Sequence, residues 1–201
     1  MSLRFTLETS LLPDEPSDIG SQYRVDVLRY SEAKSTNECM GHFTVYRFDL
    51  ATAMDQELHI IDVFDSIDKE IYDFFEYLYD HDAEDWKESV AEGFEGHDVL
   101  YFQWAEFPES LARSTGVLAA AERIVQVLGR GCSFAALWPW EKPHPDRKSS
   151  ASPESLSIWS RCDSDLFWRR IGFRRFEDTP VLVRDLSARS FPIASLLEAE
   201  E

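Results

Sequence analysis

The chain has 201 residues, of which 44% are hydrophobic and 13% aromatic, a composition that suits one packed domain and excludes an intrinsically disordered chain. The formal net charge of −18 disfavours binding to nucleic acid or to an anionic membrane surface, and no apolar run approaches membrane-spanning length. The three cysteines, Cys39, Cys132 and Cys162, form no metal-ligand spacing, so we expect reduced thiols, a cytoplasmic location and no metal site.

The N-terminal part of the chain is predicted to form strands. Leu3, Phe5 and Leu7 alternate with polar residues, which indicates a short half-buried strand. After a loop rich in Pro, Asp and Ser, residues 23–30 and 39–50 carry β-branched and aromatic residues typical of strands. We expect an antiparallel set whose pairing the sequence leaves open.

An acidic helical region follows these strands. Apolar residues recur at helical spacing from Ile67 to Leu78, with Asp65 or Ser66 as the expected cap, and a second helix is predicted over residues 83–95. The many carboxylates between residues 62 and 98 are interpreted mainly as the solvated side of these helices. A second interpretation is an acidic wall that attracts a cationic substrate.

The second half of the chain predicts a parallel strand–helix–strand crossover. Residues 98–104 read as a buried strand, Val117 to Leu128 as a helix capped by Ser114 or Thr115, and residues 132–137 as a second buried strand. The first turn of a helix offers unpaired backbone N–H groups and the positive end of the helix dipole. The start of this helix is therefore a candidate anion site.

The C-terminal part continues with a long loop, a helix and a hairpin. Residues 138–153 form a loop rich in Pro, Ser and Lys, of a length typical of lids or poorly ordered segments. A short helix is predicted to end at Gly172, and residues 173–176 and 181–183 are predicted to form a hairpin. Residues 187–201 read as a polar tail.

Two segments resemble signatures of the GNAT (GCN5-related N-acetyltransferase) superfamily. Phe167-Trp-Arg-Arg-Ile-Gly-Phe173 resembles its F-Y-x-x-x-G-F motif, and Arg113-Ser-Thr-Gly-Val-Leu118 resembles its acyl-CoA pyrophosphate loop, R/Q-x-x-G-x-G/A. The resemblance implies one α+β domain over residues 1–201, with a mixed, mostly antiparallel sheet flanked by helices and the crossover at the acyl-CoA site. Its parts would be strands and acidic helices (1–97), a CoA-binding half (98–186) and the tail (187–201).

The resemblance also implies a function. A GNAT enzyme transfers an acetyl group from acetyl-CoA to a primary amine, which attacks the thioester directly. Glu106 is then the candidate general base, and Trp168 takes the position of the Tyr that protonates the CoA thiolate in the family. The expected acetyl-CoA contacts are Trp104, Ala105, Arg113, Ser114, Thr115, Gly116, Val117, Leu118 and Phe167. The acidic composition favours a cationic acceptor. The oligomeric state is left open, with a homodimer as one alternative because GNAT-like proteins commonly dimerise.

Three departures from the family pattern keep other hypotheses open. Leu118 replaces a small residue, Trp168 replaces the Tyr, and an indole N–H is no practical proton source. The acidic helices follow the second or third strand, whereas the family places helices after the first. A second hypothesis is therefore a catalytically silent GNAT-fold protein that binds acyl-CoA as a sensor or interaction module. A third is an acidic interaction protein that mimics a nucleic-acid surface.

Overall fold

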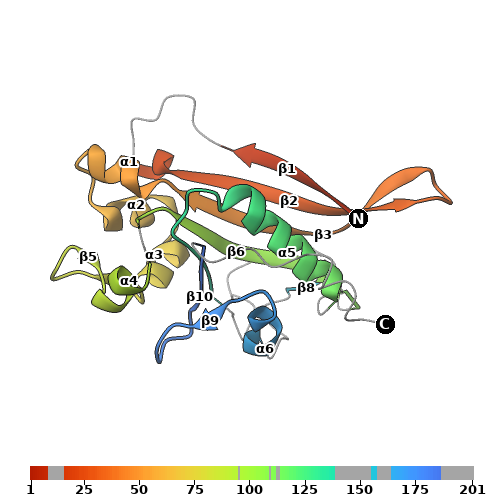
Figure 1. Cartoon of the computed structure of the whole chain (residues 1–201). Helices are drawn as coiled ribbons and strands as arrows, with labels where there is room; N and C mark the ends of the chain where they lie inside the picture. Colours follow the sequence, from red (N-terminus) through yellow and green to blue (C-terminus); the bar gives the residue numbers. More distant parts are fainter. Residues whose placement is uncertain are drawn as a thin grey trace.

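The fold is built on one twisted, mostly antiparallel sheet with helices on both faces, so the predicted α+β class is confirmed (Figure 1). The computed structural model describes residues 1–8, 16–94, 96–108, 110–111, 114–138, 155–157 and 164–186. In spatial order the strands are β1 (Ser2–Glu8), β2 (Gly20–Ser31), β3 (Thr36–Phe48), β6 (Val99–Pro108), β7 (Phe134–Leu137), β10 (Leu182–Asp185) and β9 (Arg174–Arg175). A short strand, β8 (Ser155–Ser157), pairs with β6 outside this order.

The N-terminal strands are antiparallel, as expected, and they pair in the order β1, β2, β3 as a meander. Phe5 lies opposite Val25, and Val25 lies opposite Phe43, so the alternating apolar residues of three strands share one face of the sheet. Strand β3 ends before Leu50, earlier than the predicted strand. Asp49 caps a helix there, because its carboxylate accepts the backbone N–H of Thr52 at 3.1 Å.

Four short helices and a two-stranded hairpin cover the end of the sheet marked by residues 46–48 of β3. They are α1 (Leu50–Asp55), α2 (Ile60–Ile67), α3 (Lys69–Phe75), β4 (Tyr79–Asp80), β5 (Asp85–Trp86) and α4 (Glu88–Gly93), and a 3₁₀ turn (Pro16–Ile19) packs beside them. The predicted cap at Asp65 or Ser66 is wrong, because Asp68 adopts an extended conformation that separates α2 from α3. Its carboxylate accepts the N–H of Glu70 at 2.8 Å and so caps α3.

The core under these helices is aromatic. Phe64 and Phe75 stack with ring centroids 3.6 Å apart, and Phe48 meets both rings edge to face. The helix predicted over residues 83–95 is shorter than expected, because Asp85 and Trp86 form β5 and the indole of Trp86 packs into this aromatic core. The helical periodicity of the sequence arises because apolar side chains of α2 and α3 face this core while their acidic side chains face solvent.

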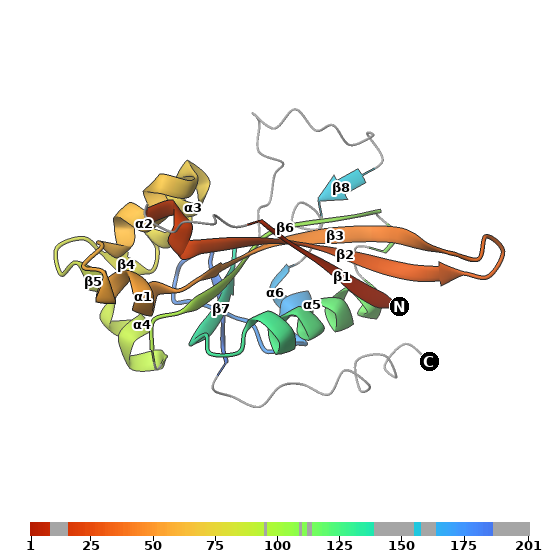
Figure 2. The ribbon, with the colours of Figure 1, turned by 90° about the horizontal axis from the view of Figure 1, so that it is seen from above.

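The opposite face carries α5 (Thr115–Leu128) and α6 (Ser164–Arg169), as Figure 2 shows. The predicted crossover is confirmed, because β6 and β7 are the one parallel pair among the described strands, from Val99 opposite Phe134 to Phe102 opposite Leu137. Ser114 caps α5, as predicted, and Gly129 ends it. The hairpin of β9 and β10 is also confirmed.

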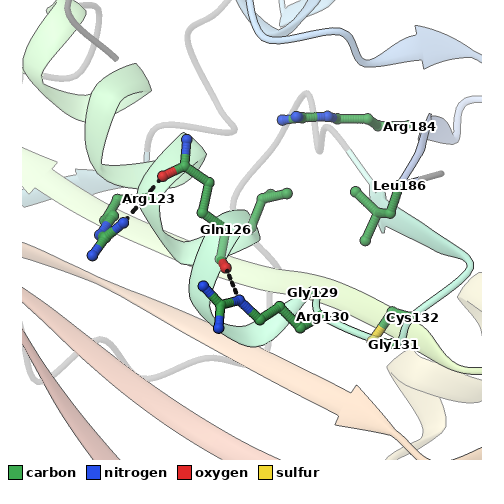
Figure 3. Close-up of a pocket in the computed structure, with 9 residues that line it drawn as sticks. Arg123, Gln126, Gly129, Arg130, Gly131, Cys132, Arg184 and Leu186 are labelled. Carbon is green, nitrogen blue, oxygen red and sulfur yellow. Dashed lines mark hydrogen bonds between the residues drawn. The ribbon is translucent and has the colours of Figure 1, made fainter. Parts of the chain in front are cut away.

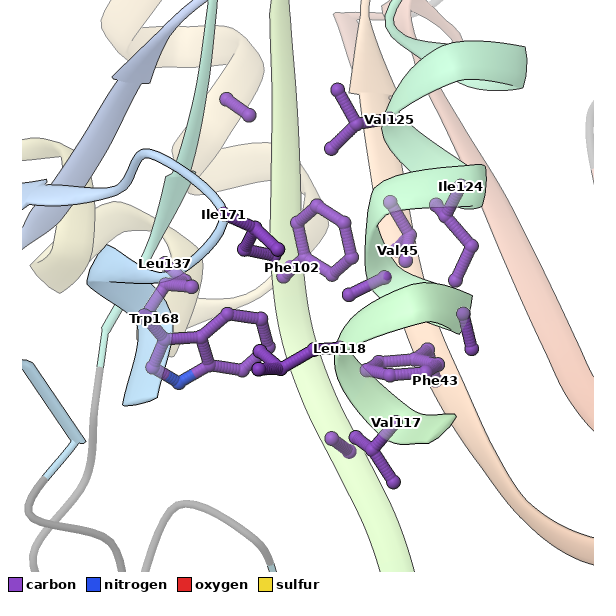
Figure 4. Packing of buried hydrophobic residues seen from close by; sticks show 14 of the residues in the cluster. Phe43, Val45, Phe102, Val117, Leu118, Ile124, Val125, Leu137, Trp168 and Ile171 are labelled. Carbon is purple, nitrogen blue, oxygen red and sulfur yellow. The ribbon is translucent and has the colours of Figure 1, made fainter. Parts of the chain in front are cut away.

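Leu118 and Trp168 meet in the core between α5, α6 and β6 (Figure 4). Both side chains are fully buried. The indole of Trp168 lies against the rings of Phe102 and Phe173, with centroid distances of 6.3 and 5.6 Å. The Leu118 side chain therefore fills volume in the core and does not reach the solvent-exposed face of α5.

Candidate functional site

Strand β6 changes its neighbour halfway along its length. A bulge at Gln103 interrupts its pairing with β3, since Thr44 lies opposite Trp104 while Val45 lies opposite Phe102. Upstream of the bulge β6 pairs with β7, and from Glu106 onward it pairs with β8. Trp104 and Ala105 lie between these two pairings and are both buried. The carboxyl end of a strand in a parallel pair is a common place for a ligand.

The N-terminus of α5 lies beside this part of β6. Thr115, Gly116, Val117 and Leu118 are all buried, and the hydroxyl oxygen of Ser114 accepts the N–H of Val117 at 3.4 Å. A Cβ atom placed on Gly116 would lie 2.5 Å from the terminal methyl of Met1, so the Met1 side chain covers this turn. Arg113, the first residue of the predicted loop, lies outside the described residues.

Two hollows flank the start of α5, and Met1, Val27 and Gly116 line both of them. The smaller, of about 60 Å³, is lined by Arg29, Met40, Phe107, Ser114 and Gly116 among others. The larger, of about 480 Å³, is an apolar groove that runs along α5 past Ala119 and Ala120 toward Arg123. Arg29 supplies a cation next to the helix start, and sequence reasoning missed it because 85 residues separate it from Ser114.

Glu106 forms a cross-strand pair with His42. The Oε2 atom of Glu106 lies 3.6 Å from Nε2 of His42, and their side chains are 39% and 15% exposed. Two bulges flank the pair, one at Gln103 and one at Met40, where the pairing of β2 with β3 shifts. Ala105 and Phe107 pack into the core under α5, so the pair lies on the opposite face of the sheet.

The same face continues outward with Asp26, which lies opposite His42 on β2. Asp26 is buried and accepts hydrogen bonds from Arg4, at 2.6 and 3.0 Å, and from Arg24, at 3.0 Å. Burial alone would raise the pKa of Asp26, but the two guanidinium groups outweigh that effect and lower the pKa. A row of polar groups from four strands therefore crosses the sheet and ends at Glu106.

The structure brings only part of the predicted site together. Ser114 and Gly116 line the smaller hollow beside β6, while Glu106 lies just across the strand. Trp168 is fully buried and Phe167 is 8% exposed, so both pack as core residues of α6. We therefore assign Trp168 to packing rather than to proton transfer. His42 had no signal in the sequence, because it reaches Glu106 only through strand register.

A third hollow lies at the other end of α5 and is lined by Arg123, Arg130 and Arg184 (Figure 3). Its volume is about 370 Å³. Arg123 donates to the side chain of Gln126 and Arg130 to its backbone carbonyl, both at 3.2 Å. Arg184 donates two hydrogen bonds to the buried carboxylate of Glu122. These guanidinium groups already have structural partners, so we do not assign a ligand to this hollow.

No protein-family model, curated protein or solved structure matches this chain. Within the described part of the chain, three or more His, Cys, Asp or Glu side chains nowhere gather in a way that could hold a metal ion. None of the described helices combines the length and the apolar character needed to cross a bilayer.

Proposed function

We propose that the protein is an acyl-CoA-dependent N-acyltransferase that moves an acetyl group from acetyl-CoA to a primary amine. One observation carries the proposal. At a bulge, β6 leaves its parallel neighbour β7 beside the N-terminus of α5, and a half-exposed carboxylate follows three residues later. The resemblance of residues 113–118 and 167–173 to GNAT signatures points to the same location.

The start of α5 would hold the pyrophosphate of CoA. The backbone N–H groups of the first turn and the helix dipole attract phosphate oxygens, and Arg29 adds a full positive charge at the same hollow. Met1 is 76% exposed and unbranched, so its side chain can leave Gly116 at low cost when the pyrophosphate binds. The apolar groove along α5 offers space for the remainder of the carrier.

The thioester would lie at the bulge of β6. The backbone of Trp104 and Ala105 lies between the stretches paired with β7 and β8, and an N–H there would stabilise the oxyanion of the tetrahedral intermediate. The amine nitrogen forms a bond to the carbonyl carbon, and the C–S bond then breaks. The CoA thiolate leaves and takes its proton from solvent, because Trp168 is buried in the core.

Glu106 would remove the proton from the attacking amine. Its carboxylate lies on the face of the sheet opposite α5, so the acceptor and the CoA carrier approach β6 from different faces. His42 lies 3.6 Å from Glu106 and can pass the proton onward as an imidazolium. A carboxylate at this point also favours a cationic acceptor.

Calorimetry with acetyl-CoA tests the proposal when it is combined with two variants of one residue. Gly116→Asp places a carboxylate at the second position of α5, where it suits the helix dipole but repels phosphate. Gly116→Ala adds a methyl group without charge and is the matched control. We expect the Asp variant to lose acetyl-CoA binding at least tenfold more than the Ala variant. Equal affinity in the two variants would place the cofactor elsewhere.

The silent acyl-CoA binder remains the second candidate, and the burial of Trp168 favours it. A thiol-release assay against a panel of amines separates the two candidates, since both predict binding and only one predicts free CoA. Binding without thiol release from any polyamine, aminoglycoside or basic peptide would favour the silent protein.

A further inference from the structure

Strand β1 leaves one edge of the sheet open. It is the last strand in the spatial order, and none of the described strands pairs with its outer side. Its register with β2 is regular over seven residues, from Ser2 opposite Leu28 to Glu8 opposite Gln22. It contains no proline and no bulge, the usual devices that stop an edge strand from pairing with another chain.

Exposed apolar side chains gather beside this edge. Seven large hydrophobic side chains are exposed in the described ranges. Three of them, Met1, Phe5 and Leu7, belong to β1 or directly precede it, and Val127 lies on α5 across the groove. Phe5 and Val127 also line the groove of about 480 Å³ between β1 and α5. An apolar patch continuous with an open strand edge is typical of a protein interface.

The sequence of β1 is complementary to itself. When two copies are laid antiparallel with Thr6 opposite Thr6, Arg4 of each copy faces Glu8 of the other, and Phe5 faces Leu7. Two charge pairs and two apolar pairs therefore form by symmetry. Arg4 already bonds to Asp26, yet its side chain stays 62% exposed and can reach a second carboxylate.

Neighbouring registers lack this match. Centring the pair on Phe5 places Arg4 opposite Thr6 and Glu8 opposite Ser2, so no charge pair forms. Shifting one copy by a single residue puts its apolar side chains on the wrong face of the sheet. One register alone therefore combines opposite charges on one face with apolar contacts on the other.

We propose that β1 pairs with β1 of a second copy of this chain, forming a two-fold symmetric dimer with one sheet running through both protomers. The contact is isologous, so each protomer uses the same patch. Phe5 and Leu7 of each copy would border the α5 groove of the other. The proposal is independent of acyl-CoA binding, and either can fail without the other.

Sedimentation equilibrium tests the dimer with a charge reversal. We expect the wild-type chain at micromolar concentration to have twice the chain mass of 23.3 kDa. Glu8→Arg places like charges opposite each other twice and should raise the dimer dissociation constant at least tenfold. Glu92→Arg, on the exposed face of α4, changes the charge equally and should leave the dissociation constant unchanged. A monomeric wild-type chain, or an equal effect of both variants, would overturn the proposal.

A cysteine pair tests the register. In a Cys39→Ser and Cys162→Ser background, Thr6→Cys places two thiols directly opposite each other, where the Cα atoms of an antiparallel pair are about 4.5–5.5 Å apart and a disulfide can form. Glu8→Cys separates the two substituted positions by four residues, about 13 Å. Mild oxidation should therefore link the Thr6→Cys chains and not the Glu8→Cys chains. Equal cross-linking of both, or of neither, would contradict this register.

Discussion

Two glutamates on opposite faces of the same sheet have very different surroundings. Glu122 on α5 is fully buried and paired with Arg184 of β10, so it ties the crossover helix to a strand two places away from β6. Glu106 on β6 is 39% exposed and lies beside the imidazole of His42. Glu122 is enclosed with a guanidinium partner, whereas the Glu106 carboxylate is open to solvent on one side. The Glu122 carboxylate therefore stabilises the fold, whereas the Glu106 carboxylate is accessible to a ligand.

Removing the buried carboxylate should have the largest effect on stability. Glu122→Ala leaves the guanidinium of Arg184 buried without its charge partner, and we expect a loss of about 3–5 kcal/mol in the free energy of unfolding. Urea denaturation followed by circular dichroism measures it. Lys69→Ala breaks the exposed pair with Asp73 and should change the free energy of unfolding far less, because solvent screens that pair. A loss below 1 kcal/mol for Glu122→Ala would remove the structural role.

Crowding the contact between β3 and the end of β6 that carries Glu106 should have the next largest effect. Gly41 has φ +152°, and a Cβ there would lie 2.3 Å from Cδ1 of Phe107 and 2.4 Å from the carbonyl oxygen of Glu106. Gly41→Ala should therefore cost about 1–3 kcal/mol and displace the strand that carries Glu106. Gly93→Ala meets no atom within 4 Å and serves as the control in the same urea assay. Equal stability of the two variants would show that β3 and β6 can separate freely.

Replacing the Glu106 carboxylate should impair activity far more than stability. Glu106→Gln should change the free energy of unfolding by less than about 0.5 kcal/mol, because the side chain is half-exposed. If Glu106 is the base, turnover in the thiol-release assay should fall by about 10²–10⁴ with little change in acetyl-CoA affinity. Glu92→Gln on α4 is the control for the loss of one surface carboxylate. Normal turnover would remove Glu106 from the mechanism.

Asp26 lies between these extremes and should respond to pH. Its pKa in the folded protein is lowered from the ordinary value of 3.8, so its contribution to stability is present above that value and is lost as the pH falls through the folded pKa. The urea midpoint of the wild-type chain should therefore decrease below about pH 4. Asp26→Asn should flatten this decrease in titrations from pH 5 to pH 2.5. An unchanged pH profile would mean that the two arginines do not stabilise the ionised form.

The parts of the fold that depend on local sequence could be predicted. The Ser114 cap, the Gly129 stop and the parallel strands on either side of α5 follow from patterns within forty residues. Helix boundaries near Asp49 and Asp68 could not be placed, because several acidic residues there can cap a helix and tertiary packing chooses among them.

Only those parts of the candidate site that are formed by residues adjacent in sequence could be predicted. Ser114 and Gly116 lie at the start of the predicted helix, beside β6. His42 and Arg29 reach the same region through pairing between strands that are far apart in sequence, and no local pattern carries that information. The orientation of Leu118 likewise depends on Trp168, fifty residues later, whose indole fills the space next to it.

The bulge at Gln103 shifts the alternation of inward-facing and outward-facing side chains along β6 by one residue. Strict alternation from Leu100 and Phe102 would send Glu106 into the apolar core beneath α5 and turn Phe107 out to solvent. The additional residue resets the phase, so the ring goes inward and the carboxylate outward. Gln103 takes no part in the proposed chemistry. By adding one residue to β6, it nevertheless determines whether the Glu106 carboxylate faces the core or the solvent.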